Sequence, residues 1–384
     1  MSGPDLAPIR AFLAPGHERL AADVSAFAAR ELRAAPEPAD DAAARSTARA
    51  LLATMGKAGV LSSIGAMDWR GCCLAREALA AASPLADAVF ALQGLGLVPI
   101  LLSGNAAMRE RWLAPTLDGR AMAAFAMTEP DAGSDVASLA TRARRDGDHY
   151  VLDGFKCFIS NAGIADYYTV FATTDAAAGS RAICCLVVPA DTPGCRFVRA
   201  QVLSAAHPLG EIAFENCRVP VANRLGEEGR GFALGLKTLD RLRATVGAAA
   251  CGMGARALAE ALAHARARKQ FGKPLGEFQL VQEKLARMAT DLTAARLLVY
   301  RAAHAADGGA ERVTLESAMP KLHATEAAQR IVDDAVQVLG GAGVLASSAV
   351  DRLYRSVRAL RIYEGTSEVQ HLVIAGLLLK QADA

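Results

Sequence analysis

The chain lacks the features that mark several large classes of protein. Its eight cysteines show no CxxC spacing, and Cys72-Cys73 and Cys184-Cys185 are adjacent pairs, which argues against a disulfide framework and a zinc site. The net charge is only +2, so neither nucleic acid nor an acidic membrane is expected as a partner. No apolar run reaches about 18 residues, and the first residues do not resemble a secretory signal. We therefore expect a cytoplasmic protein with reduced, buried thiols.

Two further absences narrow the class. No GxGxxG follows a strand-like run, which disfavours a βαβ nucleotide-binding fold. The histidines stand singly and without a metal-spaced partner, so no metal site is expected.

In contrast, 52% hydrophobic and 21% charged residues argue for a large core. A chain of 384 residues exceeds the usual size of one simple core, which predicts two or three packed domains.

The outer parts of the chain have the pattern of helices. Residues 1–119 are rich in Ala and Leu, with apolar residues three and four positions apart, and Leu92–Leu102 is almost wholly apolar, which predicts a buried helix. From 227 to 384 the helical pattern returns in longer stretches. Thr314–Leu339 is predicted to be one helix that ends at Gly340-Gly341. A four-helix arrangement is the natural packing of these elements.

The middle of the chain, residues 120–226, has the pattern of a β domain. Short β-rich runs alternate there with Gly, Pro and Asp, and Asp153-Gly154 between two such runs predicts a two-residue hairpin. The fold class expected is therefore a multidomain α+β protein. It consists of an N-terminal helical domain (1–119), a middle β-barrel-like domain (120–226) and a C-terminal four-helix bundle (227–384).

One short segment, Ala124–Asp135, combines features of a ligand-binding loop. An apolar run precedes a Thr128-Glu129-Pro130 turn and a flexible stretch that contains Gly133. Pro130 fixes one backbone angle, and Gly133 permits conformations that other residues resist. Such a segment can press backbone N–H groups and small hydroxyls against a flat or anionic ligand. A plain surface turn between two elements is the alternative that these residues leave open.

A glutamate near the C-terminus is the strongest candidate for acid–base chemistry. Glu364 lies in Tyr363-Glu364-Gly365-Thr366, before a helix for which Ser367–Gln370 predicts a capping box with Ser367 as N-cap. A carboxylate on a glycine-hinged loop can enter a dry cleft, where desolvation raises its pKa toward that of a general base. The alternatives are a plain loop acid or a partner for Arg361.

Five spaced segments, taken in order, resemble the acyl-CoA dehydrogenase family of flavoproteins. They are Ala124–Asp135, Asp153–Asn161, Arg268–Lys273, Gln337–Gly341 and Ile362–Glu368. The resemblance implies α,β-dehydrogenation of an acyl thioester, with Glu364 as the base that removes the α-proton and the flavin N5 as hydride acceptor. The Leu242 position, where some relatives carry the base on a helix, holds no acid here.

The resemblance also assigns cofactor contacts, with FAD as the expected cofactor. Phe125, Met127, Thr128, Phe158 and Ser160 match residues that line the isoalloxazine ring. Phe158 stands where the family usually has tryptophan, and Ser160 where a threonine is common. Gly133 and Ser134 match contacts to the pyrophosphate, Thr366 and Glu368 contacts from the flavin's own subunit, and Arg268, Gln270, Phe271, Gln337 and Gly341 contacts from a neighbouring subunit. A dimer or tetramer is therefore expected.

Substrate and partner assignments follow from the same resemblance. Asp240 and Arg243 match the pair that holds CoA, with Ser134 and Gly365 as further substrate contacts. Asp240 and Arg243, three residues apart, also fit an ordinary ion pair on a helix surface. An electron-transfer flavoprotein is the expected electron acceptor.

The sequence departs from the family upstream, in Gly59–Cys73, where the usual Gly-Gly-x-Gly run is missing. Phe90, Gln93 and Leu97 allow a short, cyclic or branched acyl group but do not select one. Three alternatives stay open: an oxidase, a dehydrogenase of carrier-protein thioesters, and a non-catalytic relative that kept the fold.

Overall fold

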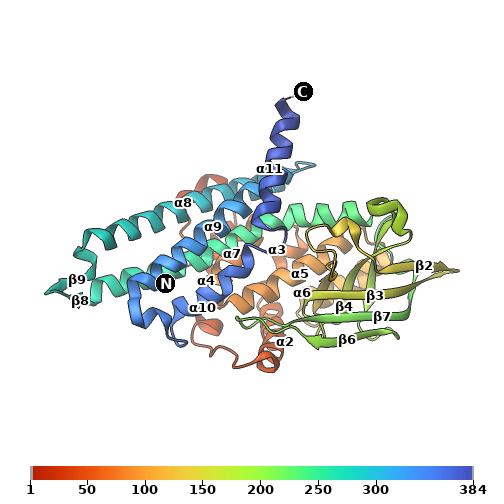
Figure 1. The fold of residues 1–384 in the computed structure, drawn as a ribbon, viewed down its shortest axis with the longest axis horizontal. Coiled ribbons are helices and arrows are strands. Elements are labelled where there is room, and N and C mark those ends of the chain that lie inside the picture. The colour runs from red at the N-terminus through yellow and green to blue at the C-terminus, as the bar shows by residue number, and fades with distance from the viewer. Residues whose placement is uncertain (1–2, 383–384) are drawn as a thin grey trace. The chain divides into compact units, whose positions relative to one another are not determined.

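The computed structural model describes residues 3–382, which fold as two compact units (Figure 1). The first unit combines residues up to 35, residues 68–87 and residues from 240 onward. The second consists of Pro36–Met67 and Ala88–Leu239. Each unit therefore brings together segments that are far apart in the sequence.

A seven-stranded sheet forms the centre of the second unit. Its strands are β1 (Ala123–Ala126), β2 (Arg142–Asp146), β3 (His149–Ser160), β4 (Tyr167–Thr173), β5 (Ile183–Pro189), β6 (Cys195–Ala200) and β7 (Leu209–Pro220). The order is β1-β4-β2-β3-β7-β6, with β5 also paired to β4. Only β1 and β2 run parallel to β4, and the other pairs are antiparallel. Every residue of β4 is buried, as expected for a central strand.

The predicted hairpin at Asp153-Gly154 is wrong, because β3 runs straight through these two residues. Asp153 pairs with Arg142 of β2, and Gly154 pairs with Phe214 of β7 across a register shift. The turn lies instead between β2 and β3, where Gly147 has a φ of 61°. Pairing with strands on both sides thus overrides the local turn signal.

Helices complete the second unit. They are α2 (Asp41–Lys57), α3 (Ser62–Gly65), α6 (Ala106–Leu117), most of α5 (Pro84–Ser103) and the first part of α7 (Gly231–Ala267). By length and composition α5 could cross a membrane, but most of it is buried within the protein, as in the core helix of a soluble fold. The prediction of a buried helix at Leu92–Leu102 is thereby confirmed.

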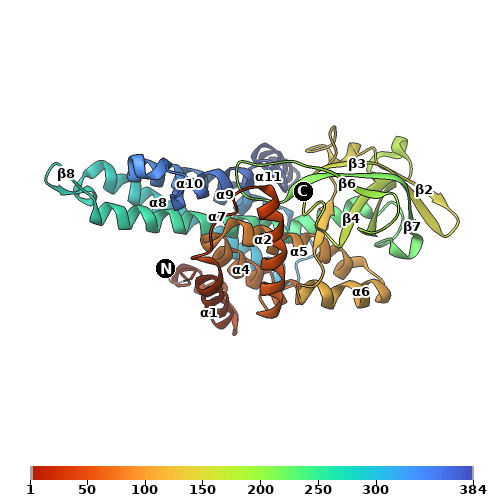
Figure 2. The ribbon, with the colours of Figure 1, turned by 90° about the horizontal axis from the view of Figure 1, so that it is seen from below.

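The first unit is helical. It contains α1 (His17–Phe27), α4 (Trp69–Ala82), the rest of α7, α8 (Gln279–Asp307), α9 (Thr314–Leu339), α10 (Ala349–Leu360) and α11 (Ser367–Ala382). The predicted bounds of α9 are confirmed. Helices α8, α10 and α11 all pack against α9. Helices α7 and α8 converge on a small hairpin of β8 (Lys269–Gln270) and β9 (Lys273–Pro274) (Figures 1 and 2).

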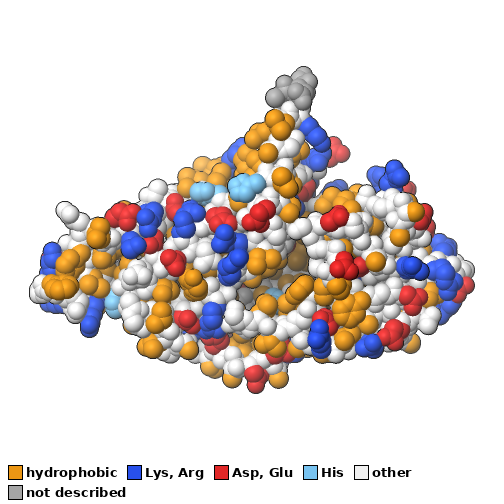
Figure 3. Space-filling view, viewed as in Figure 1, with side chains coloured by type: hydrophobic (Ala, Val, Ile, Leu, Met, Phe, Trp, Pro, Cys, Tyr) orange, Lys and Arg blue, Asp and Glu red, His pale blue; other side chains and the backbone are white. Residues whose placement is uncertain are grey.

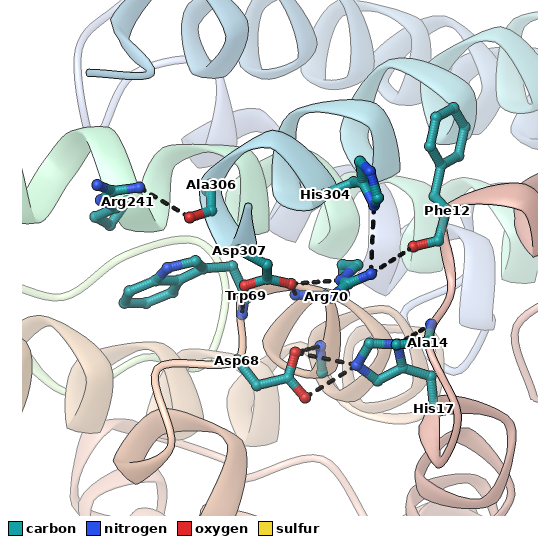
Figure 4. A network of polar contacts seen from close by, with 11 residues as sticks. Phe12, Ala14, His17, Asp68, Trp69, Arg70, Arg241, His304, Ala306 and Asp307 are labelled. Atoms are coloured by element: carbon teal, nitrogen blue, oxygen red, sulfur yellow. Dashed lines mark hydrogen bonds and ion pairs between the residues drawn. The ribbon is translucent and has the colours of Figure 1, made fainter. Parts of the chain in front are cut away.

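A polar network anchors the start of α4 on the end of α8 (Figure 4). Asp307 accepts the backbone N–H groups of Trp69 and Arg70 at 2.8 and 3.2 Å. Asp68 accepts the N–H of Gly71 at 2.9 Å and acts as the N-cap of α4. These bonds satisfy donors that a helix N-terminus otherwise leaves unpaired, so the position of α4 is fixed within its unit.

Candidate active site

The loop between α10 and α11 holds Glu364 in an uncommon backbone conformation. Glu364 has a φ of 54° and Gly365 a φ of 91°, the left-handed region that favours glycine. For a residue with a side chain this conformation costs about 1–3 kcal/mol and persists only where surrounding contacts impose it. Neighbouring side chains must therefore hold the loop.

Three side chains provide these contacts, and all act on the loop backbone. Arg243 of α7 and Gln370 of α11 donate to the carbonyl oxygen of Glu364 at 3.3 and 3.4 Å. Lys321 of α9 donates to the carbonyl oxygen of Gly365 at 2.6 Å, and Gln370 also reaches that oxygen at 3.1 Å. Lys321 and Gln370 are fully buried, so water does not compete for these bonds.

The Glu364 carboxylate, in contrast, has a buried oxygen that no described residue binds. Its Oε2 is enclosed and has no hydrogen-bond partner among residues 3–382, although the residue as a whole is only half-buried. Burial raises the pKa of this carboxyl, while the positive charges of Arg76, Arg243 and Lys321 lower it. An enclosed carboxylate with a raised pKa and a free oxygen has the properties of a general base.

Arg361 does not pair with Glu364, which removes the alternative of a simple ion pair between them. Its Nε lies 2.7 Å from Glu326 on α9. The Ser367 hydroxyl donates to the same carboxylate oxygen.

The predicted N-cap at Ser367 is wrong by one residue. Thr366 is the N-cap, because its Oγ1 accepts the backbone N–H of Val369 at 3.3 Å. Ser367 is the first helical residue, and its hydroxyl bonds to the Glu326 carboxylate. A hydrogen bond to a charged acceptor is stronger than a neutral cap, which explains the shift.

In the second unit, a buried ion pair fixes the Thr128–Asp135 segment to the sheet. Lys156 of β3 lies 2.7 Å from Glu129 and donates to the carbonyl oxygen of Met127 at 3.0 Å. Glu129 also accepts the backbone N–H groups of Ala140 and Thr141. Burial lowers the pKa of Lys156 to about 8, although Glu129 opposes this change. The start of the segment is thus fixed to the sheet, whereas Asp131 and residues 133–135 are exposed.

Phe158 is an exposed aromatic residue in a strained position beside this segment. It has a φ of 54° and is 60% exposed, at a register shift between Lys156 and Ile159 where β3 meets β7. The neighbouring N–H of Cys157 donates to the Thr128 carbonyl at 3.1 Å, so Thr128 lies next to Phe158. A bulge of this kind redirects a side chain and is frequent at functional sites.

The other predicted ring contacts lie in the same unit. Ser160 Oγ is 2.7 Å from Nε2 of His207. Burial and the charge of Arg45 lower the pKa of His207 to about 4, so the imidazole is neutral at pH 7. The rings of Phe125 and Phe171 pack at 4.9 Å. Of the remaining predicted contacts, Met127 is buried, whereas Gly133 and Ser134 are exposed.

Comparison with known proteins agrees with this arrangement. The chain matches the acyl-CoA dehydrogenase N-terminal domain over residues 14–120, the middle domain over 124–217 and the C-terminal domain over 229–379. The chain belongs to the acyl-CoA dehydrogenase family. It is accordingly an oxidoreductase that acts on CH–CH bonds, in a family that dehydrogenates acyl-CoA with a flavin.

Three similar proteins illustrate the range of this family. A 3-(aryl)acrylate reductase of Clostridium sporogenes is 44% identical over 284 residues, which cover 73% of this chain and 75% of the relative. Subunit CarC of the caffeyl-CoA reductase-Etf complex of Acetobacterium woodii is 41% identical over 290 residues, 74% and 75% of the two chains. The structure of butyryl-CoA dehydrogenase from Megasphaera elsdenii matches with a TM-score of 0.90 and 32% identity, covering 96% of this chain and 99% of that one.

In this member of the family, Asp240 and Arg243 form an ion pair in a largely buried position on α7. Arg243 Nη1 lies 2.5 Å from Asp240, and only 8% of the Arg243 side chain is exposed. Asp240 also accepts the Thr314 hydroxyl. The pair therefore differs from a helix-surface ion pair, since Arg243 reaches the Glu364 loop as well. Contact of the pair with CoA stays a prediction.

The residues predicted to touch FAD from a neighbouring subunit lie on the surface of the first unit. Arg268, Gln270 and Phe271 occupy the β8–β9 hairpin and are exposed. Phe271 has a φ of 52° and is 94% exposed, which is exceptional for an aromatic side chain. Gln337 at the end of α9 and Gly341 just beyond it are also exposed.

The residues considered for the acyl end, Phe90, Gln93 and Leu97, are all buried in the second unit. Gln93 Oε1 accepts the backbone N–H of Ala123 at 3.1 Å, and its Nε2 has no partner among the residues described. These residues pack inside the unit.

Sequence reasoning missed Lys321 and Gln370, which hold the backbone of the Glu364 loop, Arg76, whose charge lowers the pKa of Glu364, and the Glu129–Lys156 pair. Arg76, Lys156 and Lys321 each interrupt an apolar stretch, a signal that could have marked them as buried and paired. Their partners depend on tertiary packing, which the pattern does not contain.

Proposed function

We propose that this chain is an FAD-dependent acyl-CoA dehydrogenase in which Glu364 removes the α-proton of an acyl-CoA thioester. The proton passes to the carboxylate, and the product is the trans-2-enoyl-CoA. The observation that carries the proposal is the contrast within one loop: its carbonyls are held by Arg243, Lys321 and Gln370, while Oε2 of Glu364 is enclosed and free. A base needs this combination of a fixed position and an available lone pair.

The second unit fits a flat aromatic cofactor. Phe158 offers an exposed ring in a strained conformation, next to the Thr128 segment that the Glu129–Lys156 pair fixes. Ser160 lies on β3, as Phe158 does. Phe125 lies on β1, and Met127 directly follows that strand. A bound FAD supplies the acceptor for the hydride of the β-carbon. Ser160, Gly133, Ser134, Thr366 and Glu368 are the further residues that we expect to hold it.

The oligomer and the acceptor are further parts of this proposal. Hydrophobic side chains gather over the hairpin and the start of α8, where Phe271 and Leu280 are 94% and 81% exposed, and along α11, where Leu372 and Leu379 are 74% and 68% exposed (Figure 3). Exposed apolar groups of this size favour an interface between subunits. A homodimer or homotetramer in the cytoplasm would place Arg268, Gln270, Gln337 and Gly341 against the neighbour's FAD. The similarity to CarC, which its name places in an Etf complex, supports an electron-transfer flavoprotein as acceptor.

The experiment is anaerobic reduction of the purified protein by a panel of acyl-CoAs. The protein should be yellow after reconstitution with FAD, and one or more short, cyclic or branched acyl-CoAs should bleach it. A colourless protein would contradict the proposal and favour a non-catalytic relative. Readmission of air then separates two activities, since an oxidase recovers its colour rapidly and a dehydrogenase does so slowly.

The reverse reaction is a second candidate that the comparisons favour. Two of the similar proteins are named as a 3-(aryl)acrylate reductase and as a subunit of a caffeyl-CoA reductase-Etf complex. The same carboxyl, once protonated, returns its proton to the α-carbon. Mixing the reduced protein with an enoyl-CoA tests this direction, because oxidation of the flavin restores the yellow colour.

A further inference from the structure

The connection between β6 and β7, residues 201–208, lies against the end of β3. Ser160, the last residue of β3, pairs with Leu209 at the start of β7. The backbone N–H of the next residue donates to the carbonyl oxygen of Pro208 at 2.8 Å. The N–H of Gln201 donates to the carbonyl oxygen of Leu209 at 3.0 Å, which closes the connection into a loop. Both ends of this loop are therefore held beside Ser160.

Two side chains of the loop bind residues of β3 that we expect to contact the flavin. Gln201 Oε1 accepts the backbone N–H of Phe158 at 2.6 Å. His207 Nε2 lies 2.7 Å from the hydroxyl oxygen of Ser160. In the part of the chain that the structure describes, His207 is the one hydrogen-bond partner of this hydroxyl. Gln201 thus holds a backbone group, whereas His207 holds a side chain.

Arg45 of α2 fixes the loop and the end of β3 together. Its guanidinium, which is largely buried, donates to the carbonyl oxygen of Ala162 and to that of Leu209, the latter at 2.6 Å. Ala162 comes two residues after Ser160, and Leu209 comes two residues after His207. The contact between Ser160 and His207 therefore lies in a part of the unit where both backbones are anchored to the same side chain.

His207 is uncharged at neutral pH in this position. Burial lowers its pKa to about 4, and the positive charge of Arg45 acts in the same direction. A neutral imidazole offers either an N–H or a lone pair at Nε2, so it can bond to a hydroxyl in either sense. The contact with Ser160 is therefore present over the whole neutral range of pH.

Ser160 needs an external partner to hold its hydroxyl in one direction. Serine has no branch at Cβ, so its hydroxyl can occupy any of three staggered χ1 positions. Ser160 is also only half-buried, so close packing does not select one of them. The hydrogen bond to His207 removes this freedom, because the other two positions move Oγ away from Nε2.

We propose that His207 is a positioning residue of the cofactor site: it fixes the direction of the Ser160 hydroxyl, so that this group meets the flavin ring in one orientation. This role rests on the proposed function, in which Ser160 is one of the residues that hold FAD. Phe158, held through its backbone by Gln201, lies two residues away on the same strand. A single loop thus sets both an aromatic and a polar contact of β3.

The first test is the affinity of the flavin-free protein for FAD, measured by quenching of flavin fluorescence. His207→Phe keeps a flat ring and removes both nitrogens. Its dissociation constant should rise by up to about 10-fold, because the hydroxyl loses its partner and gains rotational freedom. His149→Phe is the matched control, since His149 lies at the other end of β3 and bonds to its neighbour Asp148. Equal affinities in the two variants would overturn the proposal.

Ser160→Thr separates a positioning role from a structural one. The methyl group of threonine restricts χ1 by itself, so this change should restore most of the affinity that His207→Phe loses. A histidine that only held the loop would leave a defect that a methyl group at residue 160 could not repair. Absence of rescue in the double variant would therefore contradict the proposal.

Ser160→Ala provides a second, independent comparison. Once the hydroxyl is gone, His207 has nothing to position, so Ser160→Ala combined with His207→Phe should bind FAD as Ser160→Ala alone does. Residues with separate effects would give losses that add, and that result would overturn the proposal. If the thermal midpoint shows that His207→Phe does not fold, His207→Leu replaces it in every comparison.

The proposed function can fail separately. If the wild type binds FAD but no acyl thioester bleaches it, the proposed dehydrogenation fails, while the affinities for FAD still decide the role of His207. If the wild type is bleached and neither the rescue nor the combined variant behaves as expected, only the role of His207 fails. A Ser160→Ala variant that binds FAD as the wild type does would also contradict that role.

Discussion

Lys321 Nζ lies 2.6 Å from the carbonyl oxygen of Gly365, so a fully buried cation holds the backbone one residue beyond the Glu364 carboxylate. Burial lowers the pKa of Lys321 to about 8, against the opposing charge of Glu364. The cost of burying this lysine is therefore tied to the position of the loop. A residue that only filled the core would not need a charge there.

Replacement of Lys321 by Met should loosen the loop and lower kcat by up to about 10²-fold, with FAD still bound. The acid limb of the pH profile should also move to higher pH, because one of the cations that lower the pKa of Glu364 is lost. Lys284→Met is the matched control, since Lys284 pairs with Asp334 at 2.8 Å. Equal losses in both variants would contradict a specific role of Lys321.

Glu364→Gln should make the folded protein more stable at neutral pH, despite the loss of activity. The folded-state pKa of Glu364 is raised, so its stabilising contribution is complete below the unfolded-state pKa and is lost as the pH rises through the folded value. Glutamine does not ionise, so the stability of the variant does not fall in this way as the pH rises. Thermal midpoints of the two proteins measured from pH 4 to 8 should therefore diverge as the pH rises, and parallel curves would show that the carboxyl is not buried.

Phe158→Gly should stabilise the flavin-free protein and weaken its binding of FAD. Phe158 has a φ of 54°, a conformation that glycine adopts without strain. Removing the strain stabilises the folded state by about 1–2 kcal/mol, from which the greater conformational entropy of glycine in the unfolded chain has to be subtracted. Phe158→Ala is the control, because it removes the ring but keeps the strain. Both variants should lose FAD in equilibrium dialysis, while only the glycine variant should gain in thermal midpoint.

Arg268→Ala should release FAD and weaken subunit association together. A guanidinium can grip two oxygens of a pyrophosphate, and Arg268 is exposed at the hairpin, where a neighbouring subunit could receive it. Lys269→Ala on the same hairpin should change neither property. Light scattering and flavin content measured on the same samples provide the check, and a variant that keeps both would argue against a shared cofactor site.

Elements with strong local signals could be predicted from the sequence. The helix Thr314–Leu339 has the predicted ends because Gly340, with a φ of 59°, stops it where a residue with a side chain would resist. The order of helical, β and helical parts follows from a change in hydrophobic period that needs no tertiary information. Glu364 and Phe158 stood out through motifs, and the structure gives both a strained backbone.

The rest depended on partners that are distant in sequence. Asp153-Gly154 has the composition of a turn, yet strands on both sides keep it extended. Ser367 has the composition of a cap, yet Glu326, 41 residues away, takes its hydroxyl. Arg76 and Asp87 are 11 residues apart, and nothing in the local pattern shows that they form a buried ion pair. Packing decides such cases, because local preferences amount to only about 1 kcal/mol.

The most direct measurement is anaerobic bleaching of the FAD-loaded Glu364→Gln variant by the best acyl-CoA. We predict that this protein stays yellow and binds the thioester, but that its rate of bleaching falls by several orders of magnitude, as for loss of an essential base. Asp333→Asn, an exposed acid on α9, should bleach at the wild-type rate. Bleaching of Glu364→Gln at a rate close to that of the wild type would contradict the assignment of Glu364 as the base.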